Sequence, residues 1–372
     1  MTTSTVSNEQ KAANPGVLNL VVGLVIVVLL AVLAHWLKVQ VYGIKDIGGG
    51  IPGKVLEYPL WAALVGLVAN FVLKAVKFYE YPKSGFRTEL FLKIGLVLLG
   101  ATISFTVIVT AAAGAIIQAL IMVTAVYFFS WWLGGKFGLP DTLRAVMSTA
   151  ISICGVSAAI AAAGSVLAKK EEITYITTLV IITALPLMII APILAGWMHM
   201  PEPVAGAWFG GNVDTTAAVV GAGTIYGETA QKIASIVKQT QNVLIGVVAF
   251  LLALYFSTVV EGKKERPSAS IIWQRFPKFV LGFIVASILF TIGWIPAAAK
   301  EAPLNAANLI GALKDWAFCL AFVCMGLELS VGSIKKMGWS PVVVYLIVTI
   351  FNTLLALGVS WLIFGWLFPA SL

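Results

Sequence analysis

"GGNVDTTAAVVGAG", residues 210–223, places an aspartate, an asparagine and two threonines inside a run of small apolar residues. An ionisable side chain in a segment of this kind is costly to bury in lipid, and it usually faces a cavity or a partner. Asp214 is therefore the first candidate functional residue. The structural alternative is that the glycines serve close helix packing, as in "GAWFG" at 206–210, and that Asp214 pairs with a structural lysine.

The composition around this stretch is that of an integral membrane protein. Of the 372 residues, 60% are hydrophobic and 11% are charged, whereas soluble domains carry about 25% charged residues. About eleven stretches are long and apolar enough to cross a bilayer. They cover residues 17–37, 59–79, 90–110, 112–133, 145–168, 173–198, 204–226, 232–259, 278–297, 308–328 and 341–368. The sequence predicts an all-α membrane protein with one polytopic transmembrane domain, 17–372, after a cytoplasmic tail, 1–16.

The basic residues predict the orientation of the spans. Lysine and arginine follow the even-numbered spans, for example Lys83, Arg87, Lys136, Arg144, Lys335 and Lys336. Cytoplasmic loops carry such an excess, which predicts a cytoplasmic N-terminus in a bacterial-type plasma (inner) membrane. The net charge of +8 is spread over these loops and forms no single patch with interleaved aromatic residues. A nucleic-acid partner is therefore not expected.

The chain also contains an internal repeat. "LLGATISFTVI" from Leu98 resembles "CMGLELSVGSI" from Cys324, and "FFSWWLGG" from Phe128 resembles "GVSWLIFG" from Gly358. The charge pattern runs the two copies in opposite directions across the membrane, as in transporters built from inverted repeats.

A second segment rich in small residues is "STAISICGVSAAIAAAGS" at 148–165. Ser152 and Ser157 surround Gly155, where a helix could be interrupted. Broken helices expose N–H groups that suit an anion and carbonyls that suit a sodium ion. Close helix packing is the alternative.

Lys238 lies deep in the apolar stretch 232–259. It could pair with Asp214, hold an anionic substrate, or extend its ammonium to the membrane interface. Glu328, near the end of the span 308–328, is interpreted as a solvated residue.

Several function classes are excluded by the motifs. Three cysteines without partner histidines or paired spacing indicate neither a disulfide framework nor a zinc site. "GGGIPGKV" at 48–55 has valine where a phosphate-binding loop needs serine or threonine. We find no metal cluster or nucleophile–base pair, so an enzyme is not expected.

Four segments resemble the YeiH-type sulfate exporter family, in the superfamily of bile-acid and arsenite transporters. They are "KIGLVLLGATISF" at 93–105, "DTLRAVMSTAISICGVSAAIAA" at 141–162, "GGNVDTTAAVVGAG" with the following "IVKQTQN", and "CMGLELSVGSIKKMGWSP" at 324–341. The resemblance implies inverted repeats whose discontinuous helices cross at the substrate site. Relatives typically show a His-Glu pair where this chain has Asp214 and Thr215, so its substrate and coupling ion can differ from theirs.

The sequence therefore predicts a secondary active transporter of a small anion such as sulfate or a sulfonate, working by alternating access. The expected substrate-binding residues are Ser152, Gly155, Ser157, Asn212, Thr215, Thr216 and Lys238. Asp214 is expected to couple transport by binding sodium or a proton, and no other cofactor is expected. The alternatives are a sodium/proton exchanger without an anion substrate and an anion channel. The expected partners are the anion and the lipid bilayer, and the oligomeric state, a homo-oligomer included, stays open.

Overall fold

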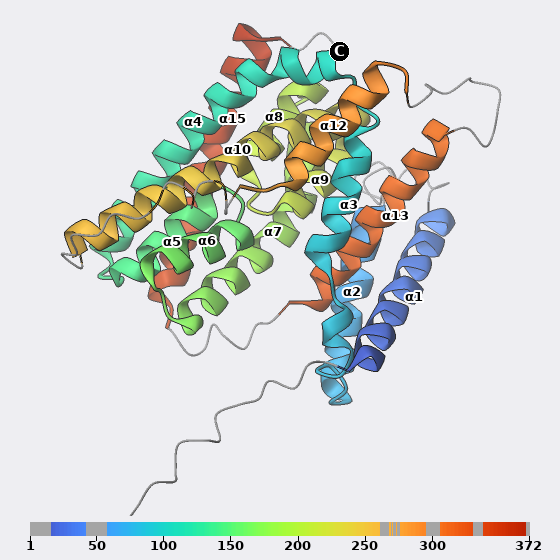
Figure 1. The fold of residues 1–372 in the computed structure, drawn as a ribbon, viewed down its shortest axis with the longest axis horizontal. Coiled ribbons are helices and arrows are strands. Elements are labelled where there is room, and N and C mark those ends of the chain that lie inside the picture. Colours follow the sequence, from blue (N-terminus) through green and yellow to red (C-terminus); the bar gives the residue numbers. More distant parts are fainter. Residues whose placement is uncertain are drawn as a thin grey trace, which may run out of the picture.

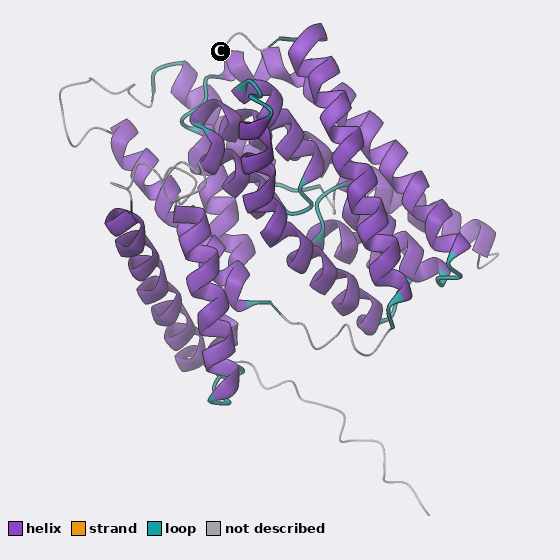
Figure 2. Cartoon of the chain, turned by 180° about the vertical axis from the view of Figure 1, so that it is seen from behind, coloured by secondary structure: helices purple, strands orange, loops and turns teal. Residues whose placement is uncertain are grey.

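The computed structural model describes residues 16–41, 58–260, 268, 270, 273, 276–294, 306–329 and 338–369. The tail 1–15, the stretch 48–55, Lys335 and Lys336 lie outside this part of the chain. The described residues form helices and connecting loops, with no strand among them (Figure 2). The prediction of an all-α membrane protein is confirmed.

The helices follow one another in the order used in Figure 1. They are α1 (Val17–Val41), α2 (Tyr58–Ala75), the 3₁₀ turn η2 (Pro82–Gly85), α3 (Thr88–Gly100), α4 (Phe105–Lys136), α5 (Asp141–Ser152), α6 (Val156–Val166), α7 (Lys170–Trp197), α8 (Glu202–Asn212), α9 (Thr216–Tyr226), α10 (Glu228–Tyr255), the π turn η3 (Phe256–Val260), α12 (Phe279–Thr291), α13 (Ala306–Leu327), α15 (Ser340–Ser360) and the π turn η4 (Trp361–Leu367).

Seven helices in the described residues are long and apolar enough to cross a membrane, so the predicted count of eleven spans is not confirmed. The stretches 145–168 and 204–226 are each two short helices, α5 with α6 and α8 with α9. The boundary between α3 and α4 lies at residues 101–104, about ten residues before the place expected from the apolar pattern alone. Ser104 sets it, because its hydroxyl caps α4 by accepting a bond from the Val107 amide.

The helices form two groups that lie side by side (Figure 1). One contains α1, α2, α3 and α13, and the other contains α4 to α10 with α15. Helix α12 packs against both α3 and α4. The helices that carry the repeated sequences pack in pairs, α3 along α13 and α4 along α15. Each pair is antiparallel, because Thr88 at the start of α3 bonds to Glu328 just past α13, and Gly114 of α4 lies against Ile363 while Phe129 stacks on Phe351. Large apolar side chains such as Leu29 and Leu354 are more than 60% exposed, as the lipid-facing surface of a membrane protein requires.

Both interruptions lie inside the larger group, where Figure 2 shows loops surrounded by helices. Gly155, at the start of α6, has φ +62°, a conformation that side chains with a Cβ rarely adopt. Thr215 starts α9, and its hydroxyl accepts a bond from the Ala218 amide at 3.2 Å. The predicted breaks are therefore produced locally by a left-handed glycine and by a threonine cap.

The glycines of α8 allow its backbone to touch α10. A Cβ built at Gly206 would lie 2.5 Å from the carbonyl oxygen of Ala230, and one at Gly210 would lie 2.8 Å from that of Ala234. The small-residue packing proposed for 206–210 is thus present, and it holds α8 rigidly beside the helix that carries Lys238.

Candidate functional site

The two helix interruptions, one at Gly155 and one at Asp214 and Thr215, touch each other, and we call this contact the crossing. A Cβ built at Gly155 would lie 3.3 Å from the Asp214 carbonyl oxygen and 3.4 Å from Cγ2 of Thr215. Gly155 and Thr215 precede α6 and α9 directly, so the N-terminal ends of these two helices meet here. Helix N-termini carry partial positive charge and unpaired N–H groups, which favour a bound anion.

Asp214 lies between α8 and α9 and is fully buried. Its Oδ2 accepts a hydrogen bond of 2.5 Å from the hydroxyl of Tyr345 on α15. Its Oδ1 is buried without a hydrogen-bond partner in the protein. Lys238 is buried as well, but its ammonium bonds to the Ile153 carbonyl and to Gln241 and not to Asp214. The carboxylate therefore keeps one oxygen free for an ion, a proton or water.

Lys238 is 1% exposed and does not extend to the membrane interface. Its ammonium donates a bond of 2.7 Å to the carbonyl oxygen of Ile153, just past the end of α5, and one of 2.9 Å to Oε1 of Gln241. An ammonium has three N–H donors. Two of them are used by these bonds, and Lys238 lines neither of the two cavities near the breaks.

The other predicted residues divide into two sets. Ser157 and Thr216 line a cavity of about 540 Å³, and Thr215 and Thr216 line an adjoining one of about 100 Å³. Asn212 lies behind the crossing, where its Oδ1 accepts a bond of 2.7 Å from Thr353. Ser152 is buried, and its hydroxyl points back to the Thr149 carbonyl at 3.5 Å. Gly155 joins the two breaks.

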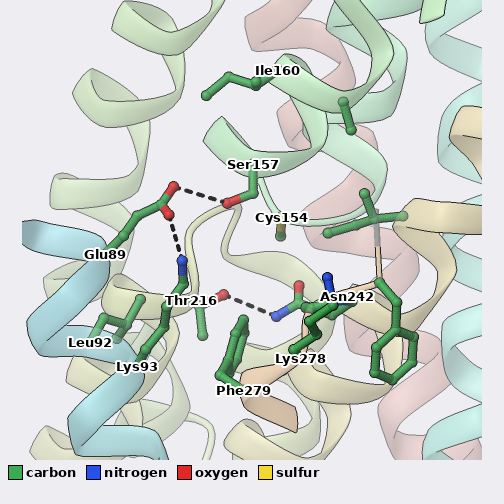
Figure 3. A pocket seen from close by; sticks show the side chains of 14 residues that line it. Glu89, Leu92, Lys93, Cys154, Ser157, Ile160, Thr216, Asn242, Lys278 and Phe279 are labelled. Carbon is green, nitrogen blue, oxygen red and sulfur yellow. Dashed lines mark hydrogen bonds and ion pairs between the residues drawn. The ribbon is translucent and has the colours of Figure 1, made fainter. Parts of the chain in front are cut away.

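The larger cavity lies between α3, the α5–α6 break, α9, α10 and α12 (Figure 3). At its floor, the amide of Asn242 donates to Thr216 Oγ1 at 3.3 Å. At its side, Glu89 accepts bonds from Ser157 at 3.3 Å and from Lys93 at 2.8 Å. Lys278 also lines it. The walls thus combine hydroxyls, amides and ammonium groups, which are the donors a small oxyanion needs.

Further polar atoms near the crossing are buried without a partner. They are Asn212 Nδ2, Asp214 Oδ1, Gln239 Nε2, Gln241 Nε2 and Asn242 Oδ1. Buried polar groups in folded proteins are nearly always hydrogen-bonded, so a cluster of unpaired ones indicates a site for water, an ion or a substrate. In the described part of the chain, no three His, Cys, Asp or Glu side chains gather as a metal cluster would require.

The model of the family described as conserved hypothetical protein 698 matches residues 22–345. The chain belongs to this family. Its relatives include UPF0324 membrane protein RB9488 of Rhodopirellula baltica, 36% identical over 91% of this chain and 62% of the relative. A UPF0324 membrane protein of Nitratidesulfovibrio vulgaris is 38% identical over 83% of this chain and 55% of the relative. UPF0324 membrane protein TauZ of Paracoccus denitrificans is 28% identical over 78% of this chain and 84% of the relative.

This chain spans 62% and 55% of the length of the first two of these relatives. No solved structure matches it. The resemblance to the YeiH-type family is confirmed, and the name shared by the relatives agrees with an integral membrane protein.

Four residues of this family member's site were missed in the sequence. Tyr345, Glu89, Lys93 and Lys278 reach the crossing or its cavity from other helices or their ends. Lys93 begins the segment 93–105 that carries part of the family resemblance, and the other three lie outside the quoted segments. The spacing of Glu89 and Lys93, i and i+4, is a partial sequence signal for a charged pair on one helix face. In the structure the two side chains form an ion pair of 2.8 Å.

Glu328 was wrongly interpreted as solvated. It lies one residue beyond α13, lines the smaller cavity, and accepts a bond of 3.0 Å from the Thr88 hydroxyl. Burial raises the pKa of Glu328 to about 7, the Thr88 hydrogen bond opposes this rise, and the nearby Glu89 carboxylate adds to it. A protonatable group therefore faces Thr215 and Thr216 from the opposite helix group.

Glu328→Gln is expected to remove part of the pH dependence of stability. Folding raises the pKa of Glu328 from 4.5 to about 7. The protonated carboxyl therefore contributes its full stabilisation below pH 4.5, and this contribution is lost as the pH rises through about 7. Between pH 5 and pH 8 the free energy of unfolding of the wild type should fall by on the order of 1 kcal/mol more than that of the glutamine variant, once solvent screening is allowed for. Thermal unfolding in detergent across this range measures it, and parallel pH profiles would contradict the assignment.

Proposed function

We propose that this protein is a secondary active transporter that carries a small anion, such as sulfate, a sulfonate or a similar oxyanion, by alternating access. The observation that carries the proposal is the contact between Gly155 and Thr215, which brings two helix N-termini together inside an apolar helical bundle. A cavity with hydroxyl, amide and ammonium groups opens beside this contact.

In this proposal the anion binds in the larger cavity. Ser157 and Thr216 supply hydroxyls there, and the N–H groups at the starts of α6 and α9 supply partial positive charge. Asn212, Thr215, Ser152 and Gly155 shape the two breaks near the anion, and Lys238, bonded to the Ile153 carbonyl, contributes its positive charge. Asp214 carries the coupling ion, sodium or a proton, on its free Oδ1.

Two features support a carrier that moves its site. The helices form two groups, and the cavity lies between α3 of one group and α6, α9 and α10 of the other. A displacement of one group against the other would change which side of the membrane the cavity faces. The proposal includes a bacterial plasma membrane and a cytoplasmic N-terminus, as the distribution of basic residues indicates.

The experiment that tests this function is anion flux into proteoliposomes containing the purified protein. A panel of radiolabelled oxyanions is offered under an imposed sodium or proton gradient, with empty liposomes as the control. Gradient-driven accumulation of an anion supports the proposal. Ion exchange that needs no added anion would instead show a sodium/proton exchanger.

Thr216→Val is expected to weaken anion binding without unfolding the protein. The substitution keeps the side-chain shape, but it removes the hydroxyl that faces the cavity and accepts the Asn242 bond. The loss of one buried hydrogen bond, about 1 to 1.5 kcal/mol, should raise KM about tenfold. Flux measured against anion concentration checks this.

Ser165→Ala is the matched control, because that hydroxyl bonds only within its own helix, to the Ala161 carbonyl at 3.0 Å. Its KM should equal that of the wild type. Equal KM values for Thr216→Val and the wild type would exclude Thr216 from the anion site.

A further inference from the structure

The carbonyl group at the end of α5 is bonded to a charged side chain. Helix C-termini carry partial negative charge and leave carbonyls without intrahelical partners. At this break the Ile153 carbonyl accepts a bond of 2.7 Å from the ammonium of Lys238, which comes from α10. A cation is thus already present at the helix end, and it is covalently part of the protein.

The end of α8 is occupied as well. The Asn212 carbonyl accepts a bond of 2.9 Å from the side-chain amide of Asn352 on α15. In discontinuous membrane helices, sodium is coordinated by the carbonyls that the break sets free. Here one carbonyl at each break, that of Ile153 at the end of α5 and that of Asn212 at the end of α8, is bonded to a side-chain donor instead.

The side-chain oxygens that remain unpaired suit a proton better than sodium. Asp214 Oδ2 is engaged by Tyr345, and the buried side-chain oxygens without a partner at the crossing are Asp214 Oδ1 and Asn242 Oδ1. The titratable groups that face Asp214 are Tyr345 from α15 and Lys238 from α10, and Cys154 at the α5–α6 break faces Lys238. One free carboxylate oxygen is enough to bind a proton, whereas a sodium ion needs several oxygen ligands.

We propose that Lys238 acts as a tethered cation at the end of α5 in place of a bound sodium ion, and that the ion coupled to transport is a proton on Asp214. This inference rests on the proposed function and selects between its two coupling ions. With Asp214 ionised, the opposite charges of Asp214 and Lys238 balance. When a proton binds Oδ1, the carboxyl becomes neutral and the charge of the Lys238 ammonium at the α5–α6 break is left uncompensated. An anion then restores neutrality, so the proton and the anion bind and move together.

The test is the sodium dependence of the wild type and of Lys238→Ala. The wild-type flux is driven by a proton gradient, with the internal and external pH held at fixed values. This flux should be unchanged when choline replaces sodium. Lys238→Ala leaves the helix end and Asp214 without their cation, so its flux should fall at least about tenfold in choline and recover with sodium. The melting temperature of this variant in detergent should rise with sodium relative to choline, because a ligand that binds only the folded state stabilises it.

Lys232→Ala is the matched control on the same helix. Lys232 lies away from the crossing and forms an ion pair of 2.7 Å with Glu228. It should behave as the wild type does. Lys238→Met keeps the length of the side chain and provides the same comparison if the alanine variant unfolds.

The inference is overturned if the wild type requires sodium for flux. It is also overturned if sodium changes neither the flux nor the melting temperature of Lys238→Ala and Lys238→Met. If the wild type moves no anion at all, the proposed function fails, and the sodium effect on melting of the Lys238 variants still decides the role of this lysine.

Discussion

Asp214→Ala is expected to lower gradient-driven anion flux by at least about a hundredfold while leaving the protein folded and inserted. The side chain is fully buried at the contact of two interrupted helices, and one of its oxygens has no partner in the protein. Without it, binding of the coupling ion and binding of the anion lose their link, so an imposed gradient should no longer drive accumulation. Flux into proteoliposomes with and without the gradient measures this loss.

Asp315→Ala is the control for the loss of an aspartate, because the Asp315 side chain on α13 is 44% exposed. Its flux should stay close to that of the wild type. Tyr345→Phe removes the hydrogen bond to Oδ2 and keeps the ring, so it should shift the pH dependence of flux without abolishing it. Unchanged ion dependence in Asp214→Ala would show that the carboxylate has a structural role only.

Gly155→Ala is expected to cost about 3 kcal/mol of stability and to inactivate transport. Gly155 has φ +62°, and an added Cβ would lie 2.5 Å from Cγ1 of Val180. Both the left-handed backbone and the steric overlap oppose alanine. The substitution also presses on the contact with Asp214 and Thr215, so the two helix starts should be displaced.

Gly138→Ala separates the two effects. Gly138 has φ +68°, and a Cβ there would meet nothing within 4 Å, so only the backbone cost of about 1 to 2 kcal/mol applies. Val180→Ala combined with Gly155→Ala should recover the part of the loss that comes from overlap. Thermal unfolding in detergent measures the stability of each variant. Equal losses of stability for Gly155→Ala and Gly138→Ala would contradict a tight contact at the crossing.

The sequence predicted the parts of this fold that depend on local physics. Apolar length identified the long helices, and the polar residues around Asp214 and Gly155 located both breaks. Strongly apolar helices such as α4 give little information on which face is buried, because every face is apolar. The α3–α4 boundary was misplaced because the apolar pattern continues across it, and the count of eleven spans is not confirmed.

The partners in the site could not be predicted, because they come from distant parts of the chain. Burial of Lys238 was one of the predicted alternatives, but its bond to the Ile153 carbonyl joins residues 85 positions apart and depends on how two breaks cross. Tyr345 reaches Asp214 across 131 positions. Glu328 was misjudged because its cavity is formed by Thr88 and by the α9 start, neither of which lies near it in sequence.

The most direct measurement of the central claim is counterflow in proteoliposomes. Vesicles loaded with an unlabelled oxyanion are placed in a trace of the same labelled anion, without an ion gradient. A carrier with one alternating site at the crossing should accumulate label transiently, and Thr216→Val should need more internal anion to do so. Passive equilibration without this overshoot, or currents far above about 10⁴ ions per second per molecule, would show a channel instead, because alternating access needs a conformational step for each cycle.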